Sequence, residues 1–184
     1  MHAPNSTTSN PPPSQEEARL MRHLPDEAAT LALGAALAPH LSPVLVITLE
    51  GDLGAGKTTL VRGLLRALGY ANKVKSPTYT LVEVHVVSGL NLYHFDFYRF
   101  NQPEEYLDAG LDEYFQASGP NAGVCLVEWP DKAGAYLPRP DLRICLSVDG
   151  RGDDAGRQVE LRALSERGRA CLTNLSSALS NPAR

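Results

Sequence analysis

The sequence predicts a single α/β domain built on a mixed central sheet, part of it antiparallel, with helices on both faces. Residues 44–49 form a continuous apolar run rich in β-branched side chains, which is typical of a parallel strand buried on both faces. A glycine-rich segment and a helical pattern over residues 57–68 follow this run directly. Farther along, several strand patterns succeed one another with few helices between them, which indicates antiparallel neighbours. The 184 residues match the usual size of one domain.

The remaining elements follow from the spacing of apolar residues. Residues 24–41 predict a first helix, whose Pro-Asp-Glu start suits the exposed N–H groups of a helix N-terminus. Residues 81–87 and 92–97 predict a hairpin, and residues 103–115 predict an acidic helix with Pro in its first turn. The last predicted elements are strands at 124–127, 142–148 and 159–164, a turn at 151–157 and a terminal helix at 166–179.

The N-terminus predicts a leader that is separate from the folded domain. Residues 1–20 are rich in Pro and Ser and lack a face to bury, so we expect a disordered leader followed by a domain over residues 21–180. The leader has no apolar core of the kind that secretory signals need. No apolar run reaches the roughly 20 residues that cross a bilayer, so we expect a cytoplasmic protein without a membrane partner.

Charge and cysteine content narrow the class of protein further. The net charge of −4 argues against a protein that grips nucleic acid on its own, because such binding requires Lys and Arg to neutralise phosphates. It leaves open a protein that acts beside RNA within a complex. The three cysteines lie far apart and include no Cys-x-x-Cys pair, which predicts buried thiols in a reducing compartment.

Residues 51–58, with the sequence GDLGAGKT, match the phosphate-loop pattern G-x-x-x-x-G-K-[ST] in full. Glycines let the backbone curl so that successive N–H groups point at phosphate oxygens. Lys57 reaches the β- and γ-phosphates, and the Thr58 hydroxyl is a magnesium ligand at the positive start of a helix. A buried strand before the motif and an amphipathic helix after it give the expected context. The sequence therefore predicts a P-loop NTPase-like domain that binds a nucleoside triphosphate with Mg²⁺.

The base of the bound nucleotide, guanine or adenine, is predicted only indirectly. A familiar GTPase carries Asn-Lys-x-Asp after a later strand as its guanine reader. Here Asn72-Lys73 lacks the following Asp and precedes the candidate switch segment. ATP is favoured by the absence of this reader.

Two segments after the phosphate loop supply further candidate polar groups. Thr78 lies in a Ser-Pro-Thr loop before a strand, where a hydroxyl can sense the γ-phosphate and magnesium, although the tripeptide also fits ordinary turn chemistry. Alternation along the next strand places His94 and Asp96 on one face. Asp96 can hold magnesium through water or orient the attacking water, whereas His94 suits a hydrogen-bonded structural role. Arg99 fits either a phosphate contact or a salt bridge.

Residues 126–130 end an apolar strand with a carboxylate, as a Walker B segment does. Glu128 is therefore a second candidate for binding magnesium or for orienting the water. Trp129, the only tryptophan, fits plain packing, packing over the site or a partner surface.

Four segments, in this order and spacing, resemble the bacterial TsaE (YjeE) proteins. They are GDLGAGKTTL at 51–60, SPTYTLV at 76–82, HFDFYR at 94–99 and VEWP at 127–130, and the likeness runs over residues 24–164. Members of that family are small P-loop ATPases needed to make N6-threonylcarbamoyladenosine (t6A) at position 37 of tRNAs that read codons beginning with A. The resemblance implies that this chain hydrolyses ATP while docked on the TsaB–TsaD pair. That pair would transfer the threonylcarbamoyl group, so contact with tRNA would be indirect. We expect hydrolysis by the isolated chain to be slow, because incomplete positioning of the water is common in P-loop switches that await a partner.

The resemblance also implies roles for residues at matching positions. Thr58 and Glu128 would be the magnesium ligands. Thr78 would lie in the first switch, while Asp96 and Trp129 would serve hydrolysis or its coupling. The phosphates would be wrapped by Leu53, Gly54, Ala55, Gly56, Lys57, Thr58 and Thr59. The nucleotide pocket would also draw on Glu27 and Arg157.

Two other functions share the same loop. A small-molecule kinase usually needs a lid and an acceptor pocket with several Arg residues, and no Arg-rich lid segment follows the central helices. A nucleotide-gated binding module would use ATP only to control docking. Both stay open as alternatives to a partner-coupled ATPase.

Overall fold

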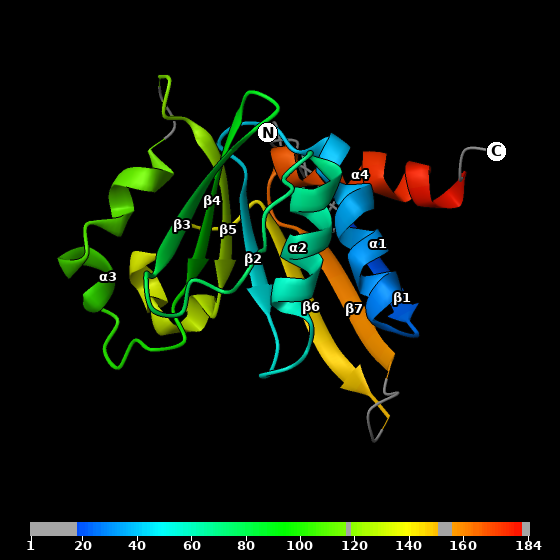
Figure 1. Cartoon of the computed structure of the whole chain (residues 1–184), viewed down its shortest axis with the longest axis horizontal. Helices are drawn as coiled ribbons and strands as arrows, with labels where there is room; N and C mark the ends of the chain where they lie inside the picture. Colours follow the sequence, from blue (N-terminus) through cyan, green and yellow to red (C-terminus); the bar gives the residue numbers. More distant parts are fainter. Residues whose placement is uncertain (1–17, 117–118, 151–155, 182–184) are drawn as a thin grey trace, which may run out of the picture.

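The computed structural model describes residues 18–116, 119–150 and 156–181, which form seven strands in one sheet. In chain order the strands are β1 (Arg19–Leu24), β2 (Val46–Glu50), β3 (Val82–Val87), β4 (Leu90–Asp96), β5 (Gly123–Glu128), β6 (Leu142–Asp149) and β7 (Gly156–Ala163). They lie in the order β1-β7-β6-β2-β5-β4-β3 (Figure 1). The four central strands are parallel, whereas β1, β7 and β3 are antiparallel to their neighbours. The predicted mixed sheet with an antiparallel portion is confirmed.

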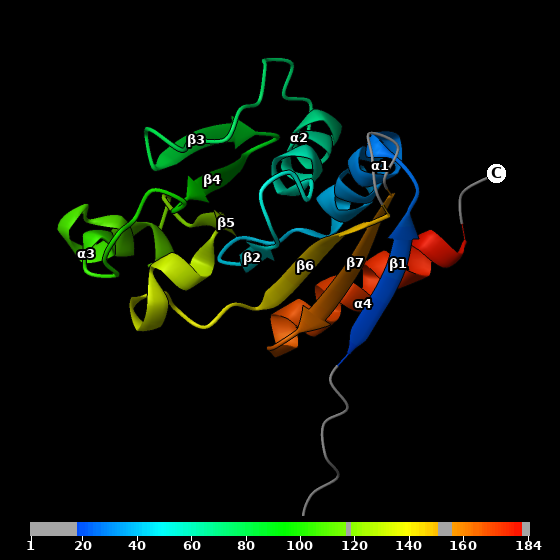
Figure 2. The ribbon, with the colours of Figure 1, turned by 90° about the horizontal axis from the view of Figure 1, so that it is seen from below.

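The helices lie on both sides of this sheet. The longer ones are α1 (Glu27–Leu37), α2 (Lys57–Ala67) and α4 (Glu166–Ser180). Their buried residues form one core with the apolar residues of β2, β6 and β7. The short elements are α3 (Glu105–Asp108) and the 3-10 turns η1 (Ala38–His40), η2 (Leu111–Phe115), η3 (Pro130–Lys132) and η4 (Gly134–Tyr136). Figure 2 shows α1 and α2 on one side of the sheet and α3 on the other.

The two faces of the sheet are covered to different extents. On the face opposite α1 and α2, an aromatic cluster that includes Phe95, Phe97 and Tyr106 packs over β2, β5 and β4. On the same face, β7 and β1 carry the charged residues Arg19 and Glu160 instead. The strands β2, β5 and β4 are therefore buried on both faces, while β6, β7 and β1, here called the antiparallel arm, are buried mainly on one.

Two glycines hold α1 close to α2, the helix that follows the phosphate loop. A Cβ added at Gly34 would lie 2.1 Å from the carbonyl oxygen of Leu60, and one added at Gly63 would lie 2.1 Å from that of Leu31. The backbones of the two helices thus touch at these positions, where no larger side chain fits. This contact fixes the start of α2 relative to the sheet.

Most predicted elements are confirmed, including the first helix, the buried parallel strand, the β3–β4 hairpin and the terminal helix. The single helix predicted over residues 103–115 is wrong. Gly110 adopts a φ of 64° and divides the segment into α3 and the 3-10 turn η2. Because a left-handed residue ends a right-handed helix, periodicity alone overestimated the helix length.

β1 is an element that the sequence did not predict, and it includes Arg19 and Leu20, which we had assigned to the leader. Its sequence, RLMRHL, is rich in residues that favour helices. Pairing with β7 along its whole length, together with packing of Leu20 on the core, outweighs that preference. Residues 1–17 and 151–155, which belong to the predicted leader and turn, lie outside the described residues.

The buried-thiol prediction is confirmed for Cys125 and Cys171 and only partly for Cys145, which is half-buried. Burial raises the pKa of the Cys125 thiol to about 12. None of the helices in the described part of the chain is both long and apolar enough to span a membrane.

Candidate functional site

The phosphate loop connects the carboxyl end of β2 to the start of α2. Gly51, Gly54 and Gly56 all have positive φ angles, of 138°, 80° and 106°, which give the loop its curl. A Cβ added at Gly51 would lie 2.2 Å from the Leu146 carbonyl oxygen, so this turn also needs the space that glycine leaves. Ala55 packs inside the loop, fully buried, and its N–H donates to the Asp52 carbonyl.

Lys57 is the first residue of α2, and its side chain bends back into the loop. Nζ donates to the carbonyl oxygens of Gly51 at 2.5 Å and Asp52 at 3.0 Å, and the residue is only 5% exposed. Burial lowers the pKa of the ammonium group, while the carboxylates of Glu128 and Asp96 oppose this shift. Nζ also lies 4.1 Å from the centre of the Trp129 ring, within the range of a cation–π contact.

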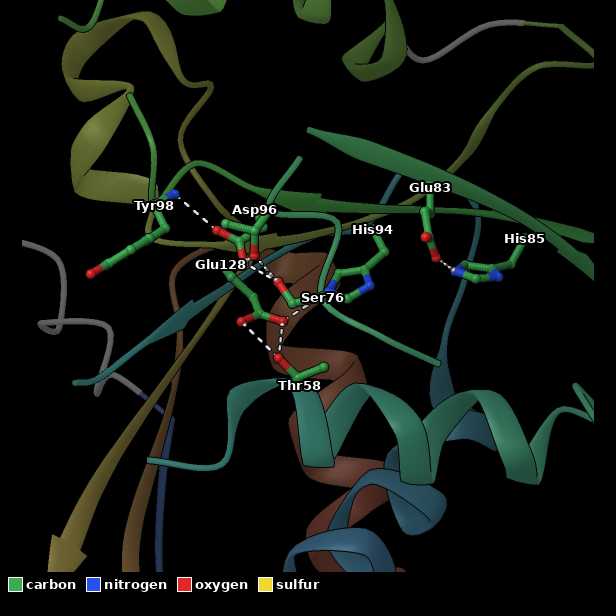
Figure 3. Close-up of polar contacts among 9 residues, drawn as sticks. Thr58, Ser76, Glu83, His85, His94, Asp96, Tyr98 and Glu128 are labelled. Carbon is green, nitrogen blue, oxygen red and sulfur yellow. Dashed lines mark hydrogen bonds and ion pairs between the residues drawn. The ribbon is translucent and has the colours of Figure 1, made fainter. Parts of the chain in front are cut away.

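Glu128 ends β5 and joins the phosphate loop to β4. The Thr58 hydroxyl donates to both oxygens of the Glu128 carboxylate, at 2.9 and 3.1 Å (Figure 3). His94 Nε2 lies 2.8 Å from Glu128 Oε1, and the side chains of His94 and Glu128 are almost fully buried. His94 therefore has the hydrogen-bonded role that its sequence context suggested, and the bond orients Glu128.

Asp96 ends β4 directly beside Glu128, because parallel pairing sets these two residues opposite each other. Ser76 and Thr78 both donate to Asp96 Oδ2, with Thr78 Oγ1 at 3.1 Å, and the Tyr98 N–H donates to Oδ1 at 2.8 Å. Asp96 thus fastens the loop of residues 76–80 to the end of the sheet. Ser76 was missed as a site residue, although its hydroxyl precedes Thr78 by two positions in the same loop.

A hollow of about 210 Å³ opens between these groups. It is lined by Leu53, Gly54, Gly56, Lys57, Thr58, Thr59, Ser76, Thr78, Asp96, Tyr98, Glu128 and Trp129. All the sequence-predicted site residues except Ala55, Glu27 and Arg157 are therefore brought together here. Arg99 does not line this hollow. Its guanidinium stacks on the exposed ring of Tyr79 at 4.1 Å and forms no salt bridge with a described residue, while the phosphate contact stays a prediction.

Glu27 and Arg157 lie on an adjoining hollow of about 320 Å³ that shares Gly54, Gly56 and Thr59 with the first. Arg157 donates to the Gly54 carbonyl at 3.4 Å. Glu27 forms an ion pair with Arg62 at 3.4 Å. Both predicted residues are thus next to the phosphate loop, and Arg62 is a further neighbour that the sequence did not indicate.

The donor set at the start of α2 suits a hard cation. The Thr58 hydroxyl and the Glu128 carboxylate are oxygen donors on the same side of the loop, as Mg²⁺ prefers. In the described part of the chain, no group of three or more His, Cys, Asp or Glu side chains could hold a metal. The arrangement therefore fits an ion that takes one or two protein ligands and completes its shell with phosphate oxygens and water.

Comparison with known proteins gives a consistent result. Residues 24–159 match the family described as threonylcarbamoyl adenosine biosynthesis protein TsaE. The chain is 41% identical to the tRNA threonylcarbamoyladenosine biosynthesis protein TsaE of Haemophilus influenzae, over 88% of this chain and 98% of the relative. It is also 41% identical to the protein of the same name from Bacillus subtilis, over 75% of this chain and 82% of the relative.

A solved structure shows the same fold. The crystal structure of Bacillus subtilis YdiB matches with a TM-score of 0.69 and 34% sequence identity, over 89% of this chain and 98% of that chain. The phosphate loop, the paired carboxylates at the ends of β4 and β5, and a match over most of the chain agree with one another. The chain belongs to the TsaE family.

Proposed function

We propose that this chain binds ATP with Mg²⁺ at the phosphate loop and hydrolyses it in support of t6A formation on tRNA. Membership of the TsaE family supports the pathway. The observation that carries the ATPase proposal is the hydrogen bond from Thr58, at the end of the phosphate loop, to the buried carboxylate of Glu128. In this proposal the pair would hold Mg²⁺ beside the β- and γ-phosphates of a nucleotide bound on the loop.

Each polar group has a defined task in this proposal. Lys57 and the loop N–H groups would bind the phosphates, and Thr58 and Glu128 would hold Mg²⁺, whose charge would offset the negative charge of the phosphoryl group. For His94 to donate to an ionised Glu128, its Nε2 must carry the proton. The bond then keeps the carboxylate from rotating away from the loop.

Asp96 positions Thr78, whose hydroxyl is proposed to sense the γ-phosphate. Its Oδ2 already accepts from Ser76 and Thr78, and its Oδ1 accepts from the Tyr98 N–H. The remaining lone pair, on Oδ1, can orient a water molecule that attacks the γ-phosphorus as the bond to ADP breaks. Asp96 would therefore couple the position of the 76–80 loop to the attacking water.

We further propose that the chain acts while docked on the TsaB–TsaD pair, and that hydrolysis by the isolated chain is slow. Large apolar side chains stand exposed here: Leu53, which lines the hollow, is 76% exposed, and Tyr79, in the 76–80 loop, is 83% exposed. Such side chains are suited to burial against a partner. A site whose water is oriented only after docking is common among P-loop switches.

The test is a reconstituted reaction with TsaB, TsaD, tRNA and Mg-ATP, in which ADP and t6A are both measured. Asp96→Asn should lower ADP production by about 100-fold, the usual cost of losing one group that stabilises the transition state, and should stop repeated t6A turnover. Asp108→Asn removes an equal charge from an exposed position and should change neither product.

Other outcomes would contradict this assignment. Undiminished t6A turnover by a hydrolysis-deficient Asp96→Asn would favour the nucleotide-gated module, which the fastening of the 76–80 loop by Asp96 also supports. A stoichiometric phosphorylated small molecule would favour a kinase.

A further inference from the structure

A hollow of about 490 Å³, here called the β2–β6 hollow, lies beside the carboxyl ends of β2 and β5 and the amino end of β6, and the proposed ATPase reaction assigns no ligand to it. Its walls are these strand ends and the segment that runs from Trp129 to Pro140. Ligands of open α/β sheets commonly bind outside the carboxyl ends of the strands. The volume lies within the range of roughly 300–1,000 Å³ that small-ligand sites occupy. Trp129 also lines the hollow at the phosphate loop, so the two sites share this side chain.

The first sign of a ligand is an unsatisfied buried hydroxyl. Thr48 lines the β2–β6 hollow, is 1% exposed, and its Oγ1 has no hydrogen-bond partner among the described residues. Buried polar side chains are nearly always hydrogen-bonded, because an unpaired one loses the bonds that it made to water. A ligand with an N–H or O–H donor would satisfy this oxygen.

The second sign is the charge of the lining. Glu50 is already engaged by Arg143, 3.0 Å away, and by the Cys145 thiol. Within the described ranges, the carboxylates of Asp52 and Asp131 have neither a hydrogen bond nor an ion pair, and the ammonium of Lys57 that attracts them is attracted more strongly by Glu128 and Asp96. Arg139 is the one remaining cation of the lining, so the groups that are not already paired carry a net charge of −1, from two carboxylates and one guanidinium.

We propose that the β2–β6 hollow binds the guanidinium or alkylammonium group of a basic ligand. The carboxylates of Asp52 and Asp131 would pair with the charge, and Thr48 Oγ1 would accept one of its N–H groups. Leu137 and Pro138 offer apolar surface for the alkyl stem of such a group. A phosphate or carboxylate ligand would meet the unpaired acidic groups and is disfavoured. This proposal does not rest on ATP hydrolysis.

Trp129 provides a direct reporter of binding, because it is the only tryptophan in the chain and forms part of the wall. The experiment titrates the full chain with two guanidinium probes and follows tryptophan fluorescence. One probe is agmatine, a free amine, and the other is the blocked peptide N-acetyl-Gly-Arg-Gly-amide. The matching Gln and Glu peptides serve as neutral and acidic controls. We expect a saturable change with a guanidinium probe and none with the two controls.

Two substitutions then test the assigned contacts. Thr48→Val keeps the shape and removes the unpaired hydroxyl, and Asp131→Asn removes an exposed carboxylate. Each should weaken guanidinium binding by about tenfold, the size expected for one hydrogen bond to a charged group. Asp108→Asn, which lies outside the hollow, should bind as the unaltered chain does. Thermal unfolding and Mg-nucleotide titration of each variant confirm that the fold is intact.

The two probes show whether the site exists and whether its ligand is a free amine or a basic side chain of a protein. Saturation by agmatine supports a free amine as ligand, and saturation by the peptide alone supports a basic side chain presented by a protein. The proposal is overturned if neither probe saturates or if the Glu peptide binds more tightly. It is also overturned if well-folded Thr48→Val and Asp131→Asn bind the probes as tightly as the unaltered chain.

Discussion

The parallel centre of the sheet and its antiparallel arm place their charged residues very differently. In the centre, Asp96 and Glu128 are buried at strand ends, where they are held by Thr58, Ser76 and other polar partners. In the arm, the charged side chain of Glu160 lies on the open face and pairs with Arg19 of β1 and with Arg162 of its own strand. Burial on both faces leaves only the strand ends for chemistry, whereas an open face tolerates charge along its whole length. The centre should therefore be sensitive to substitution and the arm tolerant of it.

The largest effect is expected at Lys57, where the central strands meet the proposed nucleotide site. Lys57→Met keeps most of the stem but removes the ammonium that lies inside the loop. Two or more charge-assisted bonds to phosphate would be lost, so affinity for Mg-ATP should fall by at least about 100-fold. Isothermal titration measures this loss. Lys73→Met, at an exposed position outside the loop, is the matched control, and equal losses in both variants would contradict the assignment.

A smaller effect, on stability, is expected at Asp141, which ties the centre to α4. This residue is 3% exposed and accepts from the Val46 N–H at 2.9 Å, from the Ser165 hydroxyl and from Arg167. Asp141→Ala would leave the Val46 N–H and the Ser165 hydroxyl without this acceptor, and we expect a loss of about 2–4 kcal/mol in the free energy of unfolding. Urea unfolding measures it. A change below about 0.5 kcal/mol would show that these bonds do not secure α4.

The smallest effect is expected at Glu160 in the arm. Its hydrogen bond to Arg162, with the help of Arg19, lowers the pKa of the Glu160 carboxyl below its ordinary value of 4.5. Such a group stabilises the fold above its unfolded-state pKa, and the contribution disappears as the pH falls through the lowered folded-state pKa. Glu160→Gln should therefore cost less than about 1 kcal/mol at neutral pH and nothing in strong acid. Urea unfolding at several pH values checks this, and a cost that grows toward acid would contradict it.

The sequence predicts the centre better than the arm, for physical reasons. Residues 44–49 and the phosphate loop carry strong local signals, because burial on both faces requires an unbroken apolar run and the loop requires glycine. β1 carries no such signal, since its strand conformation comes from pairing with β7. The break at Gly110 is equally hidden, because a single glycine does not show whether its φ is positive.

The same distinction holds for the site residues: those within a motif could be predicted, and those brought in by the fold could not. Lys57, Thr58 and Glu128 could be named from motifs, because each follows a strand or loop of recognisable pattern. Ser76 as a partner of Asp96 depends on how the 76–80 loop folds onto the sheet. The β2–β6 hollow depends on where the 129–140 segment crosses the sheet, and no local pattern encodes that position.

The central claim is that Glu128 at the end of β5 holds Mg²⁺ with the nucleotide. Its most direct test is the Mg²⁺ dependence of binding of a non-hydrolysable ATP analogue to Glu128→Gln and to Glu160→Gln, measured by isothermal titration. Because Thr58 and the phosphates would still bind the ion, we expect Glu128→Gln to lose most of the Mg²⁺-dependent gain in affinity for the analogue, while Glu160→Gln keeps the gain of the unaltered chain. A full Mg²⁺-dependent gain in a well-folded Glu128→Gln would contradict the account.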